Sequence, residues 1–174
     1  MRFTIGSACL AALALTAPRA LGHEFLLFEH LQGGNVHAVT LVDPDHAFSA
    51  EDGGRIRAWT RNPATGAWSF QHLDTGYDSR YLLRDIRFAD PQNGWACGYG
   101  GRVLRTTDGG QSWSLTASPF LTKPGSSELA DLYSVRFVFD TLAGVWRGWV
   151  VGFGGTLYTS ADGGDSWTPL AVPS

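Results

Sequence analysis

Residues 93–113 read NGWACGYGGRVLRTTDGGQSW, and residues 147–167 read RGWVVGFGGTLYTSADGGDSW. The two stretches match at an offset of 54 residues, so that Asp108 recurs as Asp162. Self-similarity at a fixed interval of some tens of residues is the sequence signature of a repeat architecture. The chain is therefore predicted to consist of repeated units.

Shorter matches extend the repeat towards the N-terminus. The segment DIRF at residues 85–88 precedes the first stretch, and SVRF at residues 134–137 precedes the second. A weaker third copy runs through VHAVTL at residues 36–41 and GGRIRA at residues 53–58, after which Asn62 stands in place of the aspartate. We therefore predict three units, at about residues 34–76, 83–118 and 132–171.

The predicted strands of the second unit are short, rich in β-branched or aromatic residues, and separated by glycines or by Asp-Pro turns. They span residues 83–88, 94–98, 102–106 and 112–117. Beyond residue 22 the chain shows no sustained apolar period of 3.6 residues. The segments 74–81 and 119–131 are expected to be linkers. A four-stranded unit repeated roughly every 40–50 residues predicts an all-β fold of β-propeller-type blades, here a partial or open propeller of about three units.

A turn motif, Ser/Thr-x-Asp-x-Gly-x-Ser/Thr-Trp, occurs in the second and third units. It comprises Thr106, Asp108, Gly110, Ser112 and Trp113, and again Ser160, Asp162, Gly164, Ser166 and Trp167. An aspartate in a tight turn can accept hydrogen bonds from nearby backbone N–H groups, and glycine permits the positive φ angles of a compact hairpin. The tryptophan can fold back onto the apolar side of the hairpin. The motif is therefore expected to be structural, and no catalytic residue is predicted.

The composition excludes several classes of protein. The 174 residues include 22 glycines and 7 tryptophans, only 17% are charged, and the formal net charge is −3. Such a chain is not a coiled coil, a helical bundle or a disordered tail, and it lacks the net positive charge of a general nucleic-acid binder. Because Cys9 and Cys97 are its only cysteines, no disulfide framework is available, and Cys97 is expected to be buried.

The first 22 residues are predicted to be a secretory signal peptide that precedes a domain at residues 23–174. Arg2 is followed by a mostly apolar run at residues 3–15, and ALG at residues 20–22 suits a signal peptidase. The run is too short to span a membrane. The chain is thus expected to be secreted or periplasmic, or lumenal in a photosynthetic organism, with no membrane span in its mature form.

The turn motif is similar to the Asp box, or BNR repeat, of sialidases, sortilin-type receptors and several glycoside hydrolases. The longer pattern from DPQNGW at residues 90–95 to Trp113 resembles the photosystem II stability/assembly factor family. The resemblance covers residues 83–171 well and residues 35–70 more weakly. It implies an exported or lumenal propeller that acts without catalysis, as an interaction scaffold in the assembly of a photosystem II-like or other membrane complex. Family members form seven-bladed rings, for which three units are too few.

A carbohydrate-active Asp-box protein, either sialidase- or glycosidase-like or glycan-binding, is the alternative. A sialidase would need an arginine cluster for the substrate carboxylate, a tyrosine nucleophile with an acid partner, and about six blades. No arginine position recurs in all three units, and Asp108 and Asp162 are assigned to turns. The sequence also shows no paired carboxylates of the kind that other glycosidases use. The non-catalytic scaffold is therefore the preferred interpretation.

The basic residues suggest where a protein partner would bind. Of the 13 basic residues 12 are arginines, and most of these lie between residues 55 and 105. The acids interspersed among them favour a solvated sheet face. If Arg84, Arg87, Arg102 and Arg105 share one face, however, they form a patch that suits an acidic protein surface.

No metal or cofactor is expected, because the five histidines show none of the spacings of a zinc site. The alternative is a copper site formed by the amine and imidazole of His23, if signal cleavage makes this residue the N-terminus.

Three blades by themselves leave apolar sheet faces without a neighbour. The sequence leaves three solutions open: self-association into a closed ring of six blades, docking onto another protein, or truncation of the gene product. Residues 23–31 are a candidate for an added outer strand that seals the last sheet.

Overall fold

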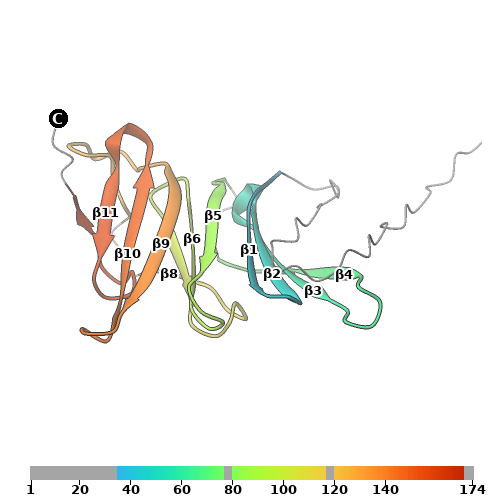
Figure 1. Ribbon diagram of the computed structural model, residues 1–174. Coiled ribbons are helices and arrows are strands. Elements are labelled where there is room, and N and C mark those ends of the chain that lie inside the picture. The colour runs from blue at the N-terminus through green and yellow to red at the C-terminus, as the bar shows by residue number, and fades with distance from the viewer. Residues whose placement is uncertain (1–34, 77–79, 117–119, 171–174) are drawn as a thin grey trace, which may run out of the picture. The chain divides into compact units, whose positions relative to one another are not determined.

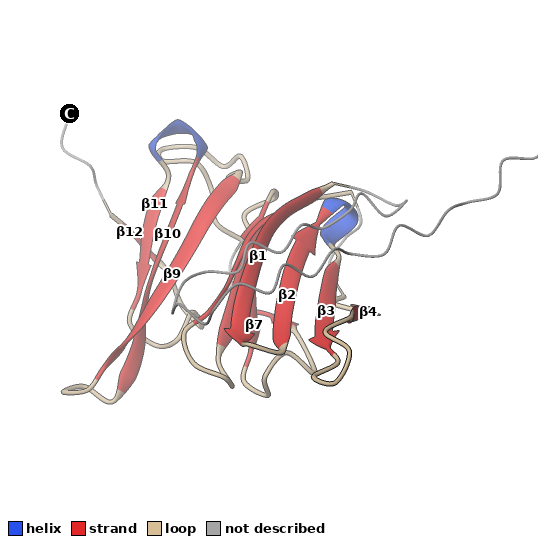
Figure 2. Ribbon diagram, turned by 45° about the vertical axis from the view of Figure 1, so that its right-hand side comes forward, coloured by secondary structure: helices blue, strands red, loops and turns tan. Residues whose placement is uncertain are grey.

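The structure is a computed structural model, and it describes residues 35–76, 80–116 and 120–170. The predictions of a signal peptide, of a copper site at His23 and of an added strand at residues 23–31 lie outside the described residues. Within the described ranges the chain forms 12 strands and two short 3-10 turns. Figure 2 shows the two turns, η1 (Asp52–Gly54) and η2 (Phe153–Gly155), in blue.

The strands form three four-stranded sheets, and within each sheet the strands lie in chain order with antiparallel pairing (Figure 1). The first sheet contains β1 (Val36–Asp43), β2 (His46–Glu51), β3 (Ile56–Arg61) and β4 (Trp68–Leu73). The second contains β5 (Leu83–Phe88), β6 (Gly94–Gly98), β7 (Val103–Thr106) and β8 (Ser114–Leu115). The third contains β9 (Leu132–Asp140), β10 (Val145–Gly152), β11 (Leu157–Ser160) and β12 (Thr168–Pro169).

The prediction of an all-β fold with four-stranded blades is confirmed. β5 and β6 have the predicted bounds, and β7 starts one residue later than predicted. The predicted fourth strand at residues 112–117 is too long. Ser112 and Trp113 belong to the turn, and only Ser114 and Leu115 pair with β7.

The segment that was expected to be a linker, residues 119–131, has structure of its own over residues 120–131. Thr122 and Leu129 form an isolated antiparallel bridge, while Leu121 and Ala130 are buried in the apolar cluster between the second and third sheets. Because the segment as a whole is rich in serine, proline and charged residues, composition alone does not reveal that this loop contributes to the core.

The first two strands pair in the same pattern in all three sheets, so residues of one sheet can be matched to residues of the others. Near the start of each first strand one residue is left out of the pairing, namely His37, Arg84 and Tyr133. Beyond this irregularity the pairs Leu41–Ala47, Phe88–Gly94 and Phe137–Gly148 correspond. In the second strand of each sheet the next residue also corresponds, and these residues are Phe48, Trp95 and Trp149. Residues related in this way are called equivalent below.

Adjacent sheets pack through a repeated aromatic contact. Phe48 of β2 stacks on Phe88 of β5 with 4.7 Å between ring centroids, and Trp95 of β6 stacks on Phe137 of β9 at 3.9 Å. The tryptophan of each Asp box meets the same phenylalanine edge-on, at 5.8 Å in the second sheet and 5.7 Å in the third. Buried aliphatic residues surround both contacts, so alternate residues of the second sheet face the first and the third sheet.

Candidate functional site

The Asp box of the second sheet closes its own hairpin turn. One carboxylate oxygen of Asp108 accepts hydrogen bonds from Thr106 Oγ1 (2.7 Å) and from the backbone N–H of Ser112 (3.0 Å). The other oxygen accepts a hydrogen bond from Ser112 Oγ at 2.6 Å. Thr106 Oγ1 in turn accepts the backbone N–H of Gly110 at 2.9 Å. The turn itself therefore uses both carboxylate oxygens.

The third sheet repeats this arrangement. Asp162 accepts Ser160 Oγ at 2.8 Å, the backbone N–H of Ser166 at 3.0 Å, and Ser166 Oγ. Ser160 Oγ accepts the backbone N–H of Gly164 at 2.8 Å. Neither aspartate is arranged as a general acid or as a metal ligand.

The Asp boxes also contact the preceding sheet, a role that the sequence did not reveal. Trp95 of the second sheet donates its Nε1–H to the carbonyl oxygen of Gly163 at 2.9 Å. A Cβ added to Gly110 would lie 2.4 Å from the ring of Phe48 in the first sheet. The paired glycines thus make room for the aromatic residue of the neighbouring sheet, in addition to their role in the turn.

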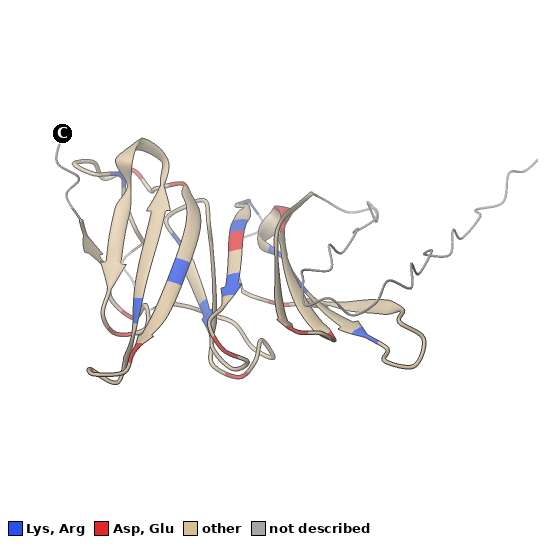
Figure 3. Ribbon diagram, viewed as in Figure 1, with Lys and Arg blue, Asp and Glu red and all other residues tan. Residues whose placement is uncertain are grey.

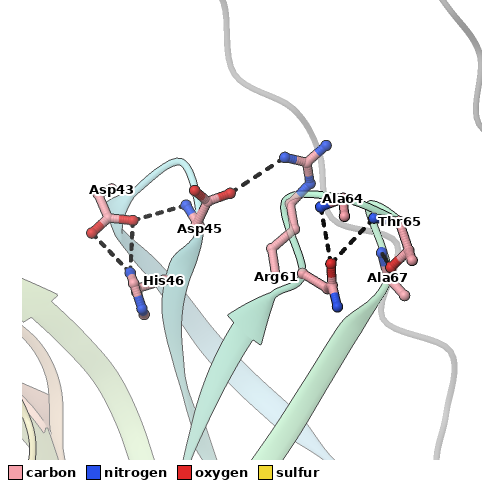
Figure 4. A network of polar contacts seen from close by, with 8 residues as sticks. Asp43, Asp45, His46, Arg61, Ala64, Thr65 and Ala67 are labelled. Atoms are coloured by element: carbon pink, nitrogen blue, oxygen red, sulfur yellow. Dashed lines mark hydrogen bonds and ion pairs between the residues drawn. The ribbon is translucent and has the colours of Figure 1, made fainter.

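The first sheet has an asparagine turn in place of an Asp box. The side-chain oxygen of Asn62 accepts the backbone N–H groups of Ala64 (2.9 Å) and Thr65 (3.2 Å), as Figure 4 shows. Beside this turn, Asp43 is hydrogen-bonded to His46, and Arg61 lies 3.3 Å from Asp45 (Figure 4). Polar contacts of this kind are typical of solvated hairpin ends. The turn between β3 and β4 of the first sheet thus differs in sequence from the Asp-box turns of the other two sheets.

The Asp-box geometry predicts that stability depends on pH. Hydrogen bonds from Ser112 and Thr106 lower the pKa of Asp108 to about 2, from 3.8. Because the folded pKa lies below the unfolded one, this stabilisation is present above about pH 4 and is lost as the pH falls towards 2. Asp108→Asn is expected to lower the free energy of unfolding by about 1 kcal/mol at pH 7 after allowance for solvent screening, and by much less near pH 2. Urea unfolding of both proteins across this pH range measures the difference.

Asp162→Asn is the matched variant. Burial opposes the shift at this position, but the hydrogen bonds from Ser166 and Ser160 outweigh it and lower the pKa of Asp162. Both variants should therefore lose their deficit in acid. A deficit that stays constant with pH would contradict an ionised carboxylate in these turns.

The four arginines that were singled out in the sequence do not gather on one face. Arg87 and Arg105 both stand opposite Trp95 in the register and so face the third sheet, where Arg105 lies 3.4 Å from Asp165. Arg102 packs instead over the rings of Tyr81 and Phe120, at 4.4 and 4.5 Å from their centroids. Strand alternation places Arg102 and Arg105 on opposite faces because they are three residues apart.

Arg87 meets a further arginine, Arg136, around a single carboxylate. Asp85 is buried, and its oxygens lie 3.1 Å from Arg87 Nε and 2.6 Å from Arg136 Nη1. The two arginine side chains are 41% and 55% exposed, so their remaining N–H groups face solvent. Figure 3 shows these basic positions on β5 and β9. The cluster thus presents more positive than negative charge.

Arg84 extends this cluster through aromatic contacts. Its guanidinium lies 5.8 Å from the ring centroid of Tyr99 and 5.6 Å from that of Tyr133. Arg84 and Tyr133 are the residues left out of the pairing in β5 and β9, a feature that is not visible in the sequence. Arg84, Arg87 and Arg136 are called the arginine cluster below.

Cys97 lies in β6 and is fully buried as a free thiol. Burial, reinforced by the charge of Asp85, raises the pKa of this thiol well above its usual range. The expectation of a packed, unreactive cysteine agrees with both findings. Among the described residues, no three His, Cys, Asp or Glu side chains gather as a metal site would require.

With this geometry in place, comparison with known proteins identifies the family. A family model described as Photosynthesis system II assembly factor YCF48 matches residues 58–173, two thirds of the chain. The chain belongs to this family. The Asp boxes and the four-stranded sheets are therefore those of a Ycf48-type protein, and the family resemblance inferred from residues 90–113 is confirmed.

Two curated relatives of the Ycf48 family match part of the chain. Photosystem II assembly lipoprotein Ycf48 from Synechococcus sp. (strain CC9902) is 30% identical over 111 residues, covering 64% of this chain and 30% of that protein. Photosystem II stability/assembly factor HCF136, chloroplastic, from Cyanidioschyzon merolae (strain NIES-3377 / 10D) is 36% identical over 77 residues, covering 44% and 15%. Both are named for assembly rather than for catalysis, which favours the scaffold over the carbohydrate-active alternative.

Two solved structures share the fold. One, titled YCF48 bound to D1 peptide, has a TM-score of 0.58 at 20% identity and is matched over 78% of this chain and 40% of its own. YCF48 from Cyanidioschyzon merolae has a TM-score of 0.55 at 24% identity, over 76% and 39%. The chain thus spans less than half the length of each of these relatives. In residues 35–76, 80–116 and 120–170, no helix has the length and apolar content needed to cross a membrane.

Proposed function

We propose that this chain is a non-catalytic interaction scaffold in the assembly of photosystem II, and that it binds a segment of the D1 protein through the arginine cluster. Membership of the Ycf48 family supports the role, and the solved YCF48 structure with a D1 peptide supports the type of ligand. The observation that carries the location is that Arg87 and Arg136 pair with one buried carboxylate, that of Asp85, while Arg84 lies beside Tyr133 of the same strand as Arg136.

The chemistry of the cluster suits a peptide with carboxylates. Guanidinium groups make paired, charge-assisted hydrogen bonds to carboxylates, and here Asp85 holds Arg87 and Arg136 in place while each keeps exposed N–H groups. Tyr99 and Tyr133, which flank Arg84, add apolar surface for a peptide backbone. Arg102 and Arg105 are not part of this proposed site, because their guanidinium groups pack against Tyr81 and Phe120 and beside Asp165.

An exported location and the absence of catalysis belong to the same proposal. The relatives are named a lipoprotein and a chloroplastic factor, and the apolar run after Arg2 suits export. A scaffold needs no reacting group, and the Asp-box carboxylates are already engaged in their own turns.

Binding of synthetic D1 peptides tests the function. Overlapping peptides that cover D1 are titrated against the purified chain, and at least one is expected to bind with an affinity that falls as salt is raised. The double variant Arg84→Gln/Arg87→Gln should weaken that binding about 10-fold or more, because two charge-assisted contacts are lost.

Arg147→Gln is the control variant. Arg147 is as exposed as Arg87 and is likewise paired with an aspartate, Asp140, but it lies outside the cluster. It should bind the peptide like the unmodified chain. Absence of binding to every D1 peptide would overturn the proposed function, and equal losses in both variants would overturn the proposed location.

A further inference from the structure

The outer face of the third sheet exposes apolar residues at positions that are buried in the other two sheets. Two positions of the second strand show this. In the first sheet they are occupied by Phe48 and Ala50 and in the second by Trp95 and Cys97, and all four residues are at most 6% exposed. The equivalents in the third sheet are Trp149 at 40% and Val151 at 42%. The third sheet thus exposes the second-strand residues that, in the first and second sheets, pack against the sheet that follows.

The first sheet exposes the first-strand residues that, in the second and third sheets, pack against the sheet that precedes them. The first-strand residues Leu83 and Ile86 of the second sheet, and Leu132 and Val135 of the third, are fully buried against the preceding sheet. Their equivalents in β1 are Val36 and Val39, and Leu41 is equivalent to Phe88 and Phe137. In β1 these residues are 40%, 38% and 47% exposed.

The two exposed faces therefore complement one another position by position. The contact between them already occurs twice within the chain, where it buries Phe48 on Phe88 and Trp95 on Phe137. Two acidic residues beside the exposed strip of the first sheet are paired within that sheet: Glu51, opposite Val36 in the register, with Arg57 at 3.0 Å, and Asp43 with His46 at 2.9 Å. Exposed apolar patches of this kind mark interaction sites in soluble proteins.

We propose that copies of this chain associate head to tail, with the third sheet of one copy packed on the first sheet of the next. Trp149 then lies against Leu41 of the neighbouring copy, in the way that Trp95 lies against Phe137 within the chain. Such a contact is heterologous, because the two copies contribute different faces to it. This inference does not depend on the proposed D1 binding.

Two single-face variants test the contact. Trp149→Glu places a charge on the outer face of the third sheet, and Val39→Glu does so on the first sheet. Sedimentation of the purified chain should show a mass above that of one copy, and each variant alone should weaken self-association at least 10-fold. Because each variant keeps one intact face, an equal mixture of the two should form a one-to-one complex.

The control is Leu142→Glu, which changes a fully exposed apolar residue in the β9–β10 turn, outside both faces. It should associate like the unmodified chain, and thermal unfolding should show that all three variants are folded. A chain that stays monomeric at every concentration, or a mixture that stays monomeric, overturns the proposal. Loss of association in Trp149→Glu but not in Val39→Glu also overturns the proposal. That result would indicate a symmetric contact in which the third sheet of one copy packs on the third sheet of another.

Discussion

Replacing Trp95 with alanine is expected to destabilise the protein by about 3–5 kcal/mol, the usual range for removal of a large buried aromatic side chain. Trp95 is almost completely buried, stacks on Phe137 and touches Trp146 edge-on. It also donates a hydrogen bond to the carbonyl oxygen of Gly163 in the Asp box of the next sheet. The variant thus loses apolar contact and leaves a buried acceptor without its donor. Urea unfolding followed by circular dichroism measures the loss.

Trp149→Ala provides the matched control, because Trp149 is equivalent to Trp95 in the register but lies on an open face. At protein concentrations where the chain is monomeric, its cost should stay within about 1 kcal/mol, as for partly exposed positions without a buried partner. A cost of Trp95→Ala that also stays within about 1 kcal/mol would show that the contact between the second and third sheets contributes little to stability.

The second large effect is expected for Gly101→Ala, at about 3–5 kcal/mol from a strained backbone and a steric clash combined. Gly101 has a φ of +67°, and a Cβ there would lie 2.0 Å from the backbone oxygen of Leu121. It cannot move away freely, because its N–H donates to Ala130 O at 2.7 Å and its carbonyl accepts Leu121 N–H at 2.8 Å. The free energy of unfolding in urea should fall accordingly.

Gly125→Ala separates the two causes of this effect. Gly125 has a similar φ of +70°, but nothing lies within 4 Å of the added Cβ. Its substitution should cost only the backbone strain, about 1–2 kcal/mol. If Gly101→Ala costs no more than Gly125→Ala, the close packing of residues 120–131 on the Gly-Gly turn is not present in solution.

Much of the fold could be predicted because its determinants are local and are repeated. The bounds of β5 and β6 follow from glycines and an Asp-Pro turn, and the hydrogen bonds around Asp108 join residues within six positions of one another. Short-range chemistry of this kind leaves its pattern in the sequence. The same pattern was specific enough to indicate the family.

The candidate site was harder to predict, because it depends on contacts between residues far apart in the chain. Arg136 reaches Asp85 across 51 positions, and no motif connects the two. Arg102 appeared to belong with Arg84 and Arg87, but its guanidinium group packs over Tyr81 and Phe120 instead. The core contribution of Leu121 and Ala130 was missed for the same reason.

The sequence by itself determined that this chain is built from four-stranded sheets with Asp-box turns, since the residues that close each hairpin are neighbours along the chain. Only the tertiary structure decided which arginines meet, and which apolar positions of the first and third sheets stay uncovered. Those properties depend on which sheet faces which. Packing between sheets is non-directional and joins distant residues, so it leaves no regular spacing in the sequence.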